Sequence, residues 1–94
     1  MRGAVRLGDF SSGHQGFPAR PAITASIDTL VNNRGQVRIG DYWATHCDDK
    51  HCHDGEQSQG SSTVFVNGRG AARTNDMISC NDFASECSSD VFLD

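Results

Sequence analysis

The sequence predicts a small all-β protein, in which short strand-and-turn repeats close around a pseudo-threefold axis. Similar segments recur along the chain, and Gly is dispersed through all of them. No window places apolar residues at helical spacing over three turns. At 94 residues, with 36% hydrophobic residues and a mean hydropathy of −0.49, the chain has a thin core. We therefore expect a single domain over residues 1–94.

The repeat is clearest in two ten-residue segments. NNRGQVRIGD (32–41) and NGRGAARTND (67–76) align without a gap at a spacing of 35 residues, and VRLGD at 5–9 is a shorter echo. Solenoid proteins stack at least three full repeats in line. Because this chain has two full copies and a partial one, closure around an axis is the better prediction.

Short β-branched or aromatic runs precede these segments. They are SIDTLV at 26–31, SSTVFV at 61–66 and, near the end of the chain, SSDVFL at 88–93. Alternation in TVFV followed by Asn67 and Gly68 predicts a strand that enters a tight turn, since both residues tolerate positive φ. Asn32 and Asn33 predict the same turn in the earlier copy.

Each copy places one candidate metal ligand four or five residues after the Asp that ends its turn. The pairs are Asp9 with His14, Asp41 with His46, and Asp76 with Cys80. Around a pseudo-threefold axis these donors would converge, and a structural zinc takes four ligands in a tetrahedron. The segment HCDDKHCHDG (46–55) supplies a fourth donor, for which we choose His53.

Other donors compete with this choice. Spacing does not exclude a site that uses Cys47, His51 or Cys52, and disulfides are possible as Cys47 with Cys52 or Cys80 with Cys87. The interleaved histidines and the lack of a secretory signal favour metal over disulfides.

The repeats carry a resemblance to a known family. SSTVFVNGRGAARTNDMISC resembles the signature of the PAAR-repeat proteins, GDFSSGHQGFPARP resembles their first turn, and IGDYWATHC followed by CHDG resembles their second. The resemblance implies a short β-structured cone with a zinc near its vertex, held by three histidines and one cysteine. Its ligands fall on His14, His46, His53 and Cys80. One departure is Asn75, where the family often has Gly, so that Asn75 must adopt a turn conformation.

The resemblance also implies a function. Such proteins cap a trimeric β-helical spike, in contractile phage tails or in the valine-glycine-repeat spike of type VI secretion, with one copy per trimer. Their open strand edges can pair with strand ends of the trimer. By similarity, the chain would help the spike to breach a target membrane or envelope outside the cell. The start MRGAVRLGDF lacks the apolar stretch of a signal peptide, so we expect synthesis in the cytoplasm. Because the last copy stops soon after SSDVFL, we expect no effector domain after it.

Several other functions are not expected. The net charge of −4 and the scattered basic residues argue against nucleic acid, and no run approaches the roughly 20 apolar residues of a membrane span. A free-standing zinc module or a small zinc hydrolase is the alternative, with Asp48, Asp49 or Asp54 as general base. We expect no enzyme, because four donors would close the site.

The aromatic residues near the predicted ligands have two possible roles. Phe10, Phe17 and Trp43 could insert into a membrane. Since apolar residues are few, we expect them instead to pack under the turns that carry His14 and His46. The segment PARP (18–21) predicts an extended connection.

Overall fold

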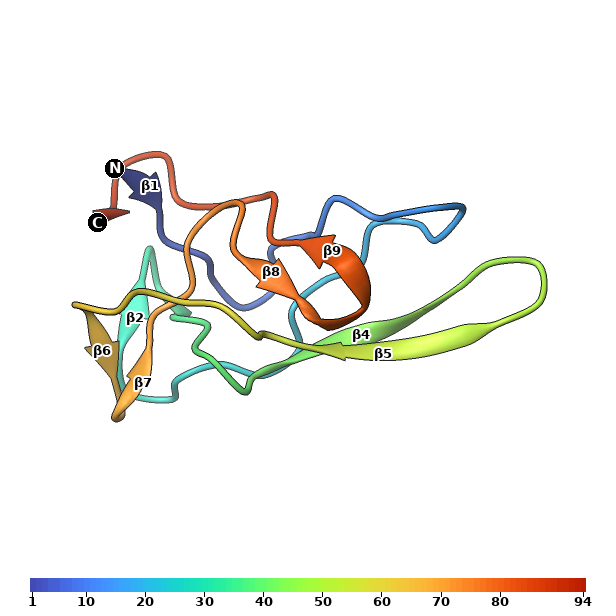
Figure 1. Cartoon of the computed structure of the whole chain (residues 1–94). Coiled ribbons are helices and arrows are strands. Elements are labelled where there is room, and N and C mark those ends of the chain that lie inside the picture. Colours follow the sequence, from blue (N-terminus) through green and yellow to red (C-terminus); the bar gives the residue numbers. More distant parts are fainter.

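The computed structural model describes all 94 residues of the chain as short strands joined by turns (Figure 1). It is elongated, with extents of 38 × 23 × 21 Å. None of its helices has the length and apolar character that crossing a membrane requires. The elements in chain order are β1 (Arg2–Gly3), β2 (Leu30–Val31), β3 (Arg34–Gly35), β4 (Tyr42–Cys47), β5 (Cys52–Glu56), β6 (Phe65–Val66), β7 (Arg69–Gly70), β8 (Met77–Ile78), the 3-10 turn η1 (Ser79–Asn81), β9 (Asp82–Phe83) and β10 (Phe92–Leu93). The prediction of an all-β protein is confirmed.

Three short antiparallel ladders repeat one register. They are β2 with β3, β6 with β7, and β1 with β10. In each, an apolar residue faces a glycine; the pairs are Leu30 with Gly35, Phe65 with Gly70, and Phe92 with Gly3. The third ladder joins the two ends of the chain, which lie together in Figure 1. The segments VRLGD and SSDVFL are therefore two halves of one repeat.

The turns of the two continuous hairpins have the backbone that the sequence predicts. Asn32 and Asn33 have φ values of 54° and 65°, and Asn67 and Gly68 have 53° and 77°. Two successive positive φ angles give a turn whose twist matches that of the strands. In the third ladder the chain ends take the place of this turn.

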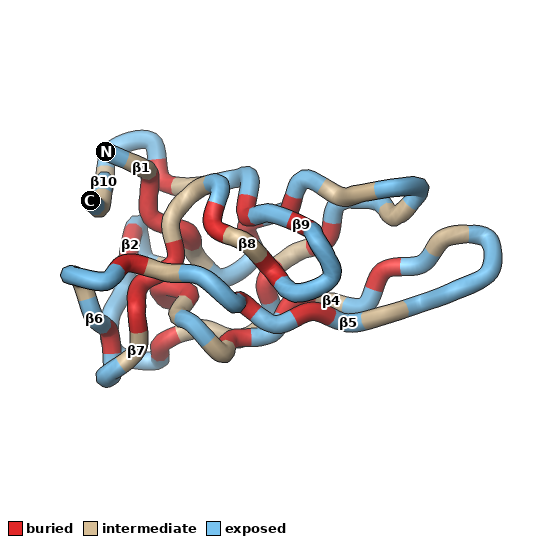
Figure 2. The backbone as a smooth tube through the Cα atoms, viewed as in Figure 1, coloured by how far each residue is buried: buried red, intermediate tan, exposed pale blue.

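The three copies meet at a closed ring of backbone hydrogen bonds. The Val37 amide donates to the Val5 carbonyl (2.9 Å), the Ala72 amide donates to the Val37 carbonyl (2.8 Å), and the Val5 amide donates to the Ala72 carbonyl (3.1 Å). All three residues are fully buried, and Figure 2 shows buried backbone next to β1, β2 and β7. Because the ring closes after three steps, the predicted pseudo-threefold axis passes through it.

One side chain breaks this symmetry at the axis. Gln36 is buried, and its Nε2 lies within 3.1 Å of the carbonyl oxygens of all three ring residues. The positions equivalent to Gln36 in the other copies are Ala4 and Ala71. The interior on the axis thus holds one amide, whose donors are satisfied by the ring.

An Arg and a buried Asp at the end of each repeat form a clamp. Within each copy the Arg amide and Nε both donate to one Asp carboxylate at 2.7–2.9 Å; the pairs are Arg6 with Asp9, Arg38 with Asp41, and Arg73 with Asp76. A second Arg from another copy approaches each carboxylate; these pairs are Arg34 with Asp9, Arg69 with Asp41, and Arg2 with Asp76. The spacing of Arg and Asp in the repeat therefore sets contacts both within and between copies.

The long hairpin of β4 and β5 extends away from the chain ends (Figure 1). Trp43 faces Gly55 and His46 faces His53, so that β4 uses one more residue than β5 between these pairs. Such a bulge shifts the alternation of side chains along a strand. As a result, Trp43 and His46 both point inward and are buried, although three positions separate them.

The expectation for the aromatic residues holds in part. Trp43 is fully buried in the core, and its Nε1 donates to Gln57 Oε1 at 3.0 Å. Phe17 packs against the histidines, as described below. Phe10 is 44% exposed, so the expectation of a packed Phe10 is wrong. It lies between buried Asp9 and Ser11 in an extended stretch, where alternation turns its side chain outward.

Candidate metal centre

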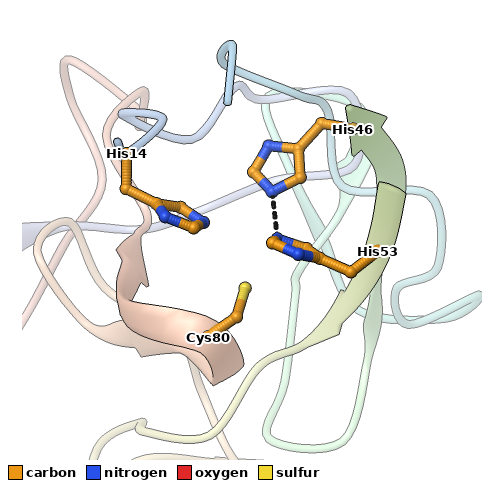
Figure 3. Close-up of side chains that lie close together, drawn as sticks. All are labelled: His14, His46, His53 and Cys80. Carbon is orange, nitrogen blue, oxygen red and sulfur yellow. Dashed lines mark hydrogen bonds between the residues drawn. The ribbon is translucent and has the colours of Figure 1, made fainter. Parts of the chain in front are cut away.

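The structure brings together the four predicted ligands, His14, His46, His53 and Cys80. One potential ligand atom from each of His14, His46, His53 and Cys80 lies within 4.8 Å of all the others. In Figure 3 the three imidazoles and the Cys80 side chain point toward a common centre. They come from a turn before Phe17, from the hairpin of β4 and β5, and from η1.

His14 is positioned by a tight turn. Its amide donates to the Phe17 carbonyl at 3.0 Å, and the Phe17 amide donates back to the His14 carbonyl at 2.6 Å. Gln15 and Gly16 between them have φ values of 41° and 87°. The sequence HQGF therefore closes a two-residue turn that holds the imidazole toward the hairpin.

His46 and His53 are held by strand pairing. They face each other in the register of β4 and β5, and their Nε2 atoms are 2.6 Å apart. His46 Nδ1 lies 2.8 Å from the Pro18 carbonyl oxygen. A carbonyl oxygen only accepts hydrogen bonds, so His46 carries its proton on Nδ1. Nε2 of the neutral ring is then unprotonated, and its lone pair can bind a metal.

Cys80 enters the site from a strained backbone. Its φ is 69° and that of Asn81 is 68°. A left-handed conformation costs a side-chain-bearing residue roughly 1–2 kcal/mol. The three-residue η1 joins β8 to β9, and the left-handed Cys80 lies within it, with its Sγ facing the histidines (Figure 3).

Phe17 covers the histidines. Its ring centroid lies 4.3 Å from that of His53, 4.8 Å from that of His46 and 5.0 Å from that of His14. Burial lowers the pKa of His53, and repulsion from Arg20 and from the protonated forms of His46 and His14 lowers it further. A neutral imidazole is the form that binds a metal.

The residues present fit a metal ion. His14 Nε2 is a buried polar atom without a hydrogen-bond partner, and such atoms in native structures are rare. Three imidazole nitrogens and one thiol, drawn toward one centre, form a donor set typical of tetrahedral metal sites. A cation at this centre would satisfy the unpaired nitrogen.

The sequence model of the PAAR motif matches residues 12–85. This chain belongs to the PAAR family. The match spans most of the chain and includes all four residues of the centre. PAAR proteins are structural spike-tip proteins of contractile injection systems. No curated protein matches the sequence significantly.

The prediction for two cysteines of this PAAR protein is wrong. We expected metal rather than disulfides to account for the cysteines, but Cys47 and Cys52 are joined by a disulfide. They face each other one position beyond His46 and His53, with Cα atoms 4.1 Å apart. Strand alternation directs them away from the histidines, which removes both from the centre. Cys80 and Cys87 are free.

The remaining candidates near the PAAR centre lie outside it. The side chain of His51 is 76% exposed. Asp48 accepts hydrogen bonds from the amides of Lys50 and His51, and these bonds lower its pKa. Asp49 and Asp54 are exposed. The acidic residues therefore shape or flank the hairpin loop.

Sequence reasoning missed one residue of the PAAR centre. Arg20 is buried, and its guanidinium donates to Cys80 Sγ at 3.3 Å. The two prolines of PARP (18–21) predict only an extended connection. A basic residue between two prolines carries no pattern that marks it as buried, although the buried Asp82 that pairs with it is also in the chain.

Proposed function

We propose that this PAAR protein is a zinc-stabilised tip that caps a trimeric β-helical spike, with one copy per trimer. The observation that supports it best is the closed ring of Val5, Val37 and Ala72. One chain with a pseudo-threefold base offers similar contacts to three identical chains. It can therefore sit on a threefold axis without a symmetry mismatch.

Apolar side chains around the base support this docking. Leu30, Phe65 and Phe92 occupy equivalent positions in the three ladders and are 57%, 61% and 48% exposed. These ladders lie at the end opposite the loop between β4 and β5 (Figure 1). Because exposed apolar residues in a symmetric set favour an interface, we assign the spike to this end.

Four protein donors would close the metal centre. His14, His46, His53 and Cys80 fill the tetrahedron that zinc takes in structural sites. Bound zinc would cross-link segments that are as many as 66 residues apart in the chain, at an end of the molecule with little core. Structural zinc stabilises small domains by roughly 10 kcal/mol or more. This role is structural and not catalytic.

Stoichiometry tests the docking. Native mass spectrometry of the chain mixed with a β-helical spike trimer should give one copy per trimer, and three copies would contradict the proposal. Phe65→Asp should weaken the complex. Phe83→Asp is the matched control, since Phe83 is 40% exposed but belongs to β9 and not to a ladder of the base.

Metal analysis tests the centre. Protein purified without chelator or added metal should hold one equivalent of zinc. A cobalt-substituted sample should show a tetrahedral spectrum with one thiolate ligand. No metal, or two thiolates, would contradict the ligand set.

The biological setting follows from the same proposal. The chain would be made in the cytoplasm and would join the spike of a phage tail or of a type VI secretion system. It would then leave the cell at the tip of that spike. There it would touch a target membrane or envelope briefly. Electron microscopy of assembled spikes with a labelled chain would locate it.

A further inference from the structure

We infer that Arg20 is a positioning residue of the metal centre, which holds the Cys80 sulfur and fixes the ligand-bearing segments relative to one another. This inference rests on the metal centre proposed above. Arg20 is 2% exposed, and its side chain is among the most buried in the protein. A buried guanidinium requires compensating partners, because an unpaired charge in the interior is costly.

The guanidinium of Arg20 contacts two of the ligand-bearing segments directly. Its Nη2 donates to Cys80 Sγ at 3.3 Å. Its Nη1 donates to the carbonyl oxygens of Ala44 at 3.2 Å and His53 at 3.4 Å, on the two strands of the long hairpin. A planar group with donors in several directions can bind all three acceptors at once, which an ammonium cannot do in the same way.

Asp82 extends these contacts to the third segment. It is fully buried, and its Oδ2 lies 3.4 Å from Arg20 Nε. Its Oδ1 accepts hydrogen bonds from the Gly13 amide at 2.9 Å and from Ser12 Oγ at 3.1 Å. Residues 12 and 13 lead directly into His14. The pair of Arg20 and Asp82 therefore touches every segment that supplies a ligand.

A buried ion pair of this kind is poorly explained by stability alone. Replacing such pairs with apolar residues is often neutral or stabilising. Here one of the donors of Arg20 is directed at a sulfur atom that faces the histidines. Hydrogen bonds to metal-binding groups orient them and tune their electronic properties. The contacts of Arg20 match that role.

Gly55 provides the space that Arg20 occupies. A Cβ added at Gly55 would lie 2.8 Å from Cζ of Arg20 and closer still to its Nη2. Gly55 faces Trp43 in the hairpin and is buried. The same Cβ would lie 2.9 Å from Cγ2 of Ile78, so Gly55→Ala should displace both the guanidinium and Ile78, while it leaves the charge and the four ligands in the chain. It serves as a second, independent variant.

The test uses cobalt-loaded full-length protein. In Arg20→Met the charge-transfer band from sulfur to cobalt should move to longer wavelength, because the lost hydrogen bond no longer stabilises the sulfur electrons. Release of the metal to a chelator should be at least about tenfold faster. Arg20→Lys keeps the charge but not the planar guanidinium, so neither the band position nor the release rate should return fully to the wild-type value. Gly55→Ala should shift the band and the release rate in the same direction as Arg20→Met.

Arg34→Met is the matched control. Arg34 pairs with buried Asp9 at 3.0 Å, in the base and away from the centre. It should lower stability without moving the band. If Arg20→Met folds, an unchanged band and an unchanged rate of metal release would overturn the inference. If Arg20→Met does not fold, an unchanged band and release rate in Gly55→Ala would overturn it. If wild-type protein takes up no cobalt, the metal centre itself is wrong; normal uptake with unchanged variants removes only the role of Arg20.

Discussion

The Nε2 atoms of His46 and His53 lie 2.6 Å apart at facing positions of one bulged hairpin. Pairing alone brings these two imidazoles together, whereas His14 and Cys80 must reach the same point from other segments. They do so through a tight turn and through left-handed backbone. The centre thus combines one locally determined pair with two donors that depend on the whole fold.

Loss of a donor should destabilise the protein far more than loss of a neighbour outside the centre. His46→Ala or Cys80→Ala should lower the melting temperature by roughly 10 °C or more, since both reduce metal affinity. His51→Ala should have little effect because His51 is exposed. Cys87→Ala removes only a partly buried thiol beside the core. Equal melting temperatures in all four variants would refute the ligand assignment.

The Gln36 amide on the axis should be required for full stability of the fold. Gln36→Ala removes the amide that contacts three carbonyls and leaves a cavity, which should cost about 1–3 kcal/mol in urea unfolding. If the axis is truly pseudo-threefold, the amide can be supplied from another copy. Adding Ala71→Gln to Gln36→Ala should therefore recover part of the loss. Further destabilisation in this double variant would contradict equivalence of the three positions.

The repeat explains why so much of the base was predictable. The gapless alignment of 32–41 with 67–76 identified turns, strands and their order around the axis, because each copy makes the same clamp between Arg and Asp. The sequence did not show that the third copy is divided between the two chain ends. That division depends on β1 pairing with β10, which is a contact between distant segments.

The centre was predictable to a smaller extent. Repeat register selected His14, His46 and Cys80, but the partner of His46 depended on strand register, which spacing leaves open. The same register pairs Cys47 with Cys52 and excludes them from the centre. Arg20 could not be recognised at all, since its role depends on burial against Gly55 and Asp82.

Acid should weaken the clamp at Asp41. Burial raises the pKa of this carboxyl, but hydrogen bonds from the Arg38 side chain and amide and from Thr24 lower it by more, so the net shift is downward. The folded state therefore binds the proton less tightly than the unfolded state, whose pKa is about 3.9. The resulting stabilisation is complete above that pKa and is lost as pH falls through the folded pKa.

Comparison with Asp41→Asn isolates this effect. Urea unfolding of both proteins from about pH 7 down to pH 2 should give a difference in stability that is largest at neutral pH and shrinks in acid. Protonation of the histidines contributes equally to both proteins and cancels in the difference. A difference that stays constant over this range would show that ionised Asp41 does not stabilise the fold.

Reduction of the disulfide should have a limited effect. Cys47 and Cys52 close a loop of only four intervening residues, so the chain-entropy model gives about 2 kcal/mol for the bond. Cys47→Ser combined with Cys52→Ser should lower stability by no more than this and should keep the single-thiolate cobalt spectrum. Loss of that spectrum in the double variant would mean that one of these cysteines contributes a ligand.

Asn75 should be a site where the protein can be stabilised. Its φ is 69°, whereas the equivalent positions are Gly8 and Gly40, with φ values of 85° and 92°. Asn tolerates this backbone less well than Gly. Asn75→Gly should therefore raise stability by about 0.5 kcal/mol in urea unfolding, even though Gly adds entropy to the unfolded chain. The reciprocal variant Gly40→Asn should lower it. If both changes move stability in the same direction, the turns of the three copies are not equivalent in their backbone requirements.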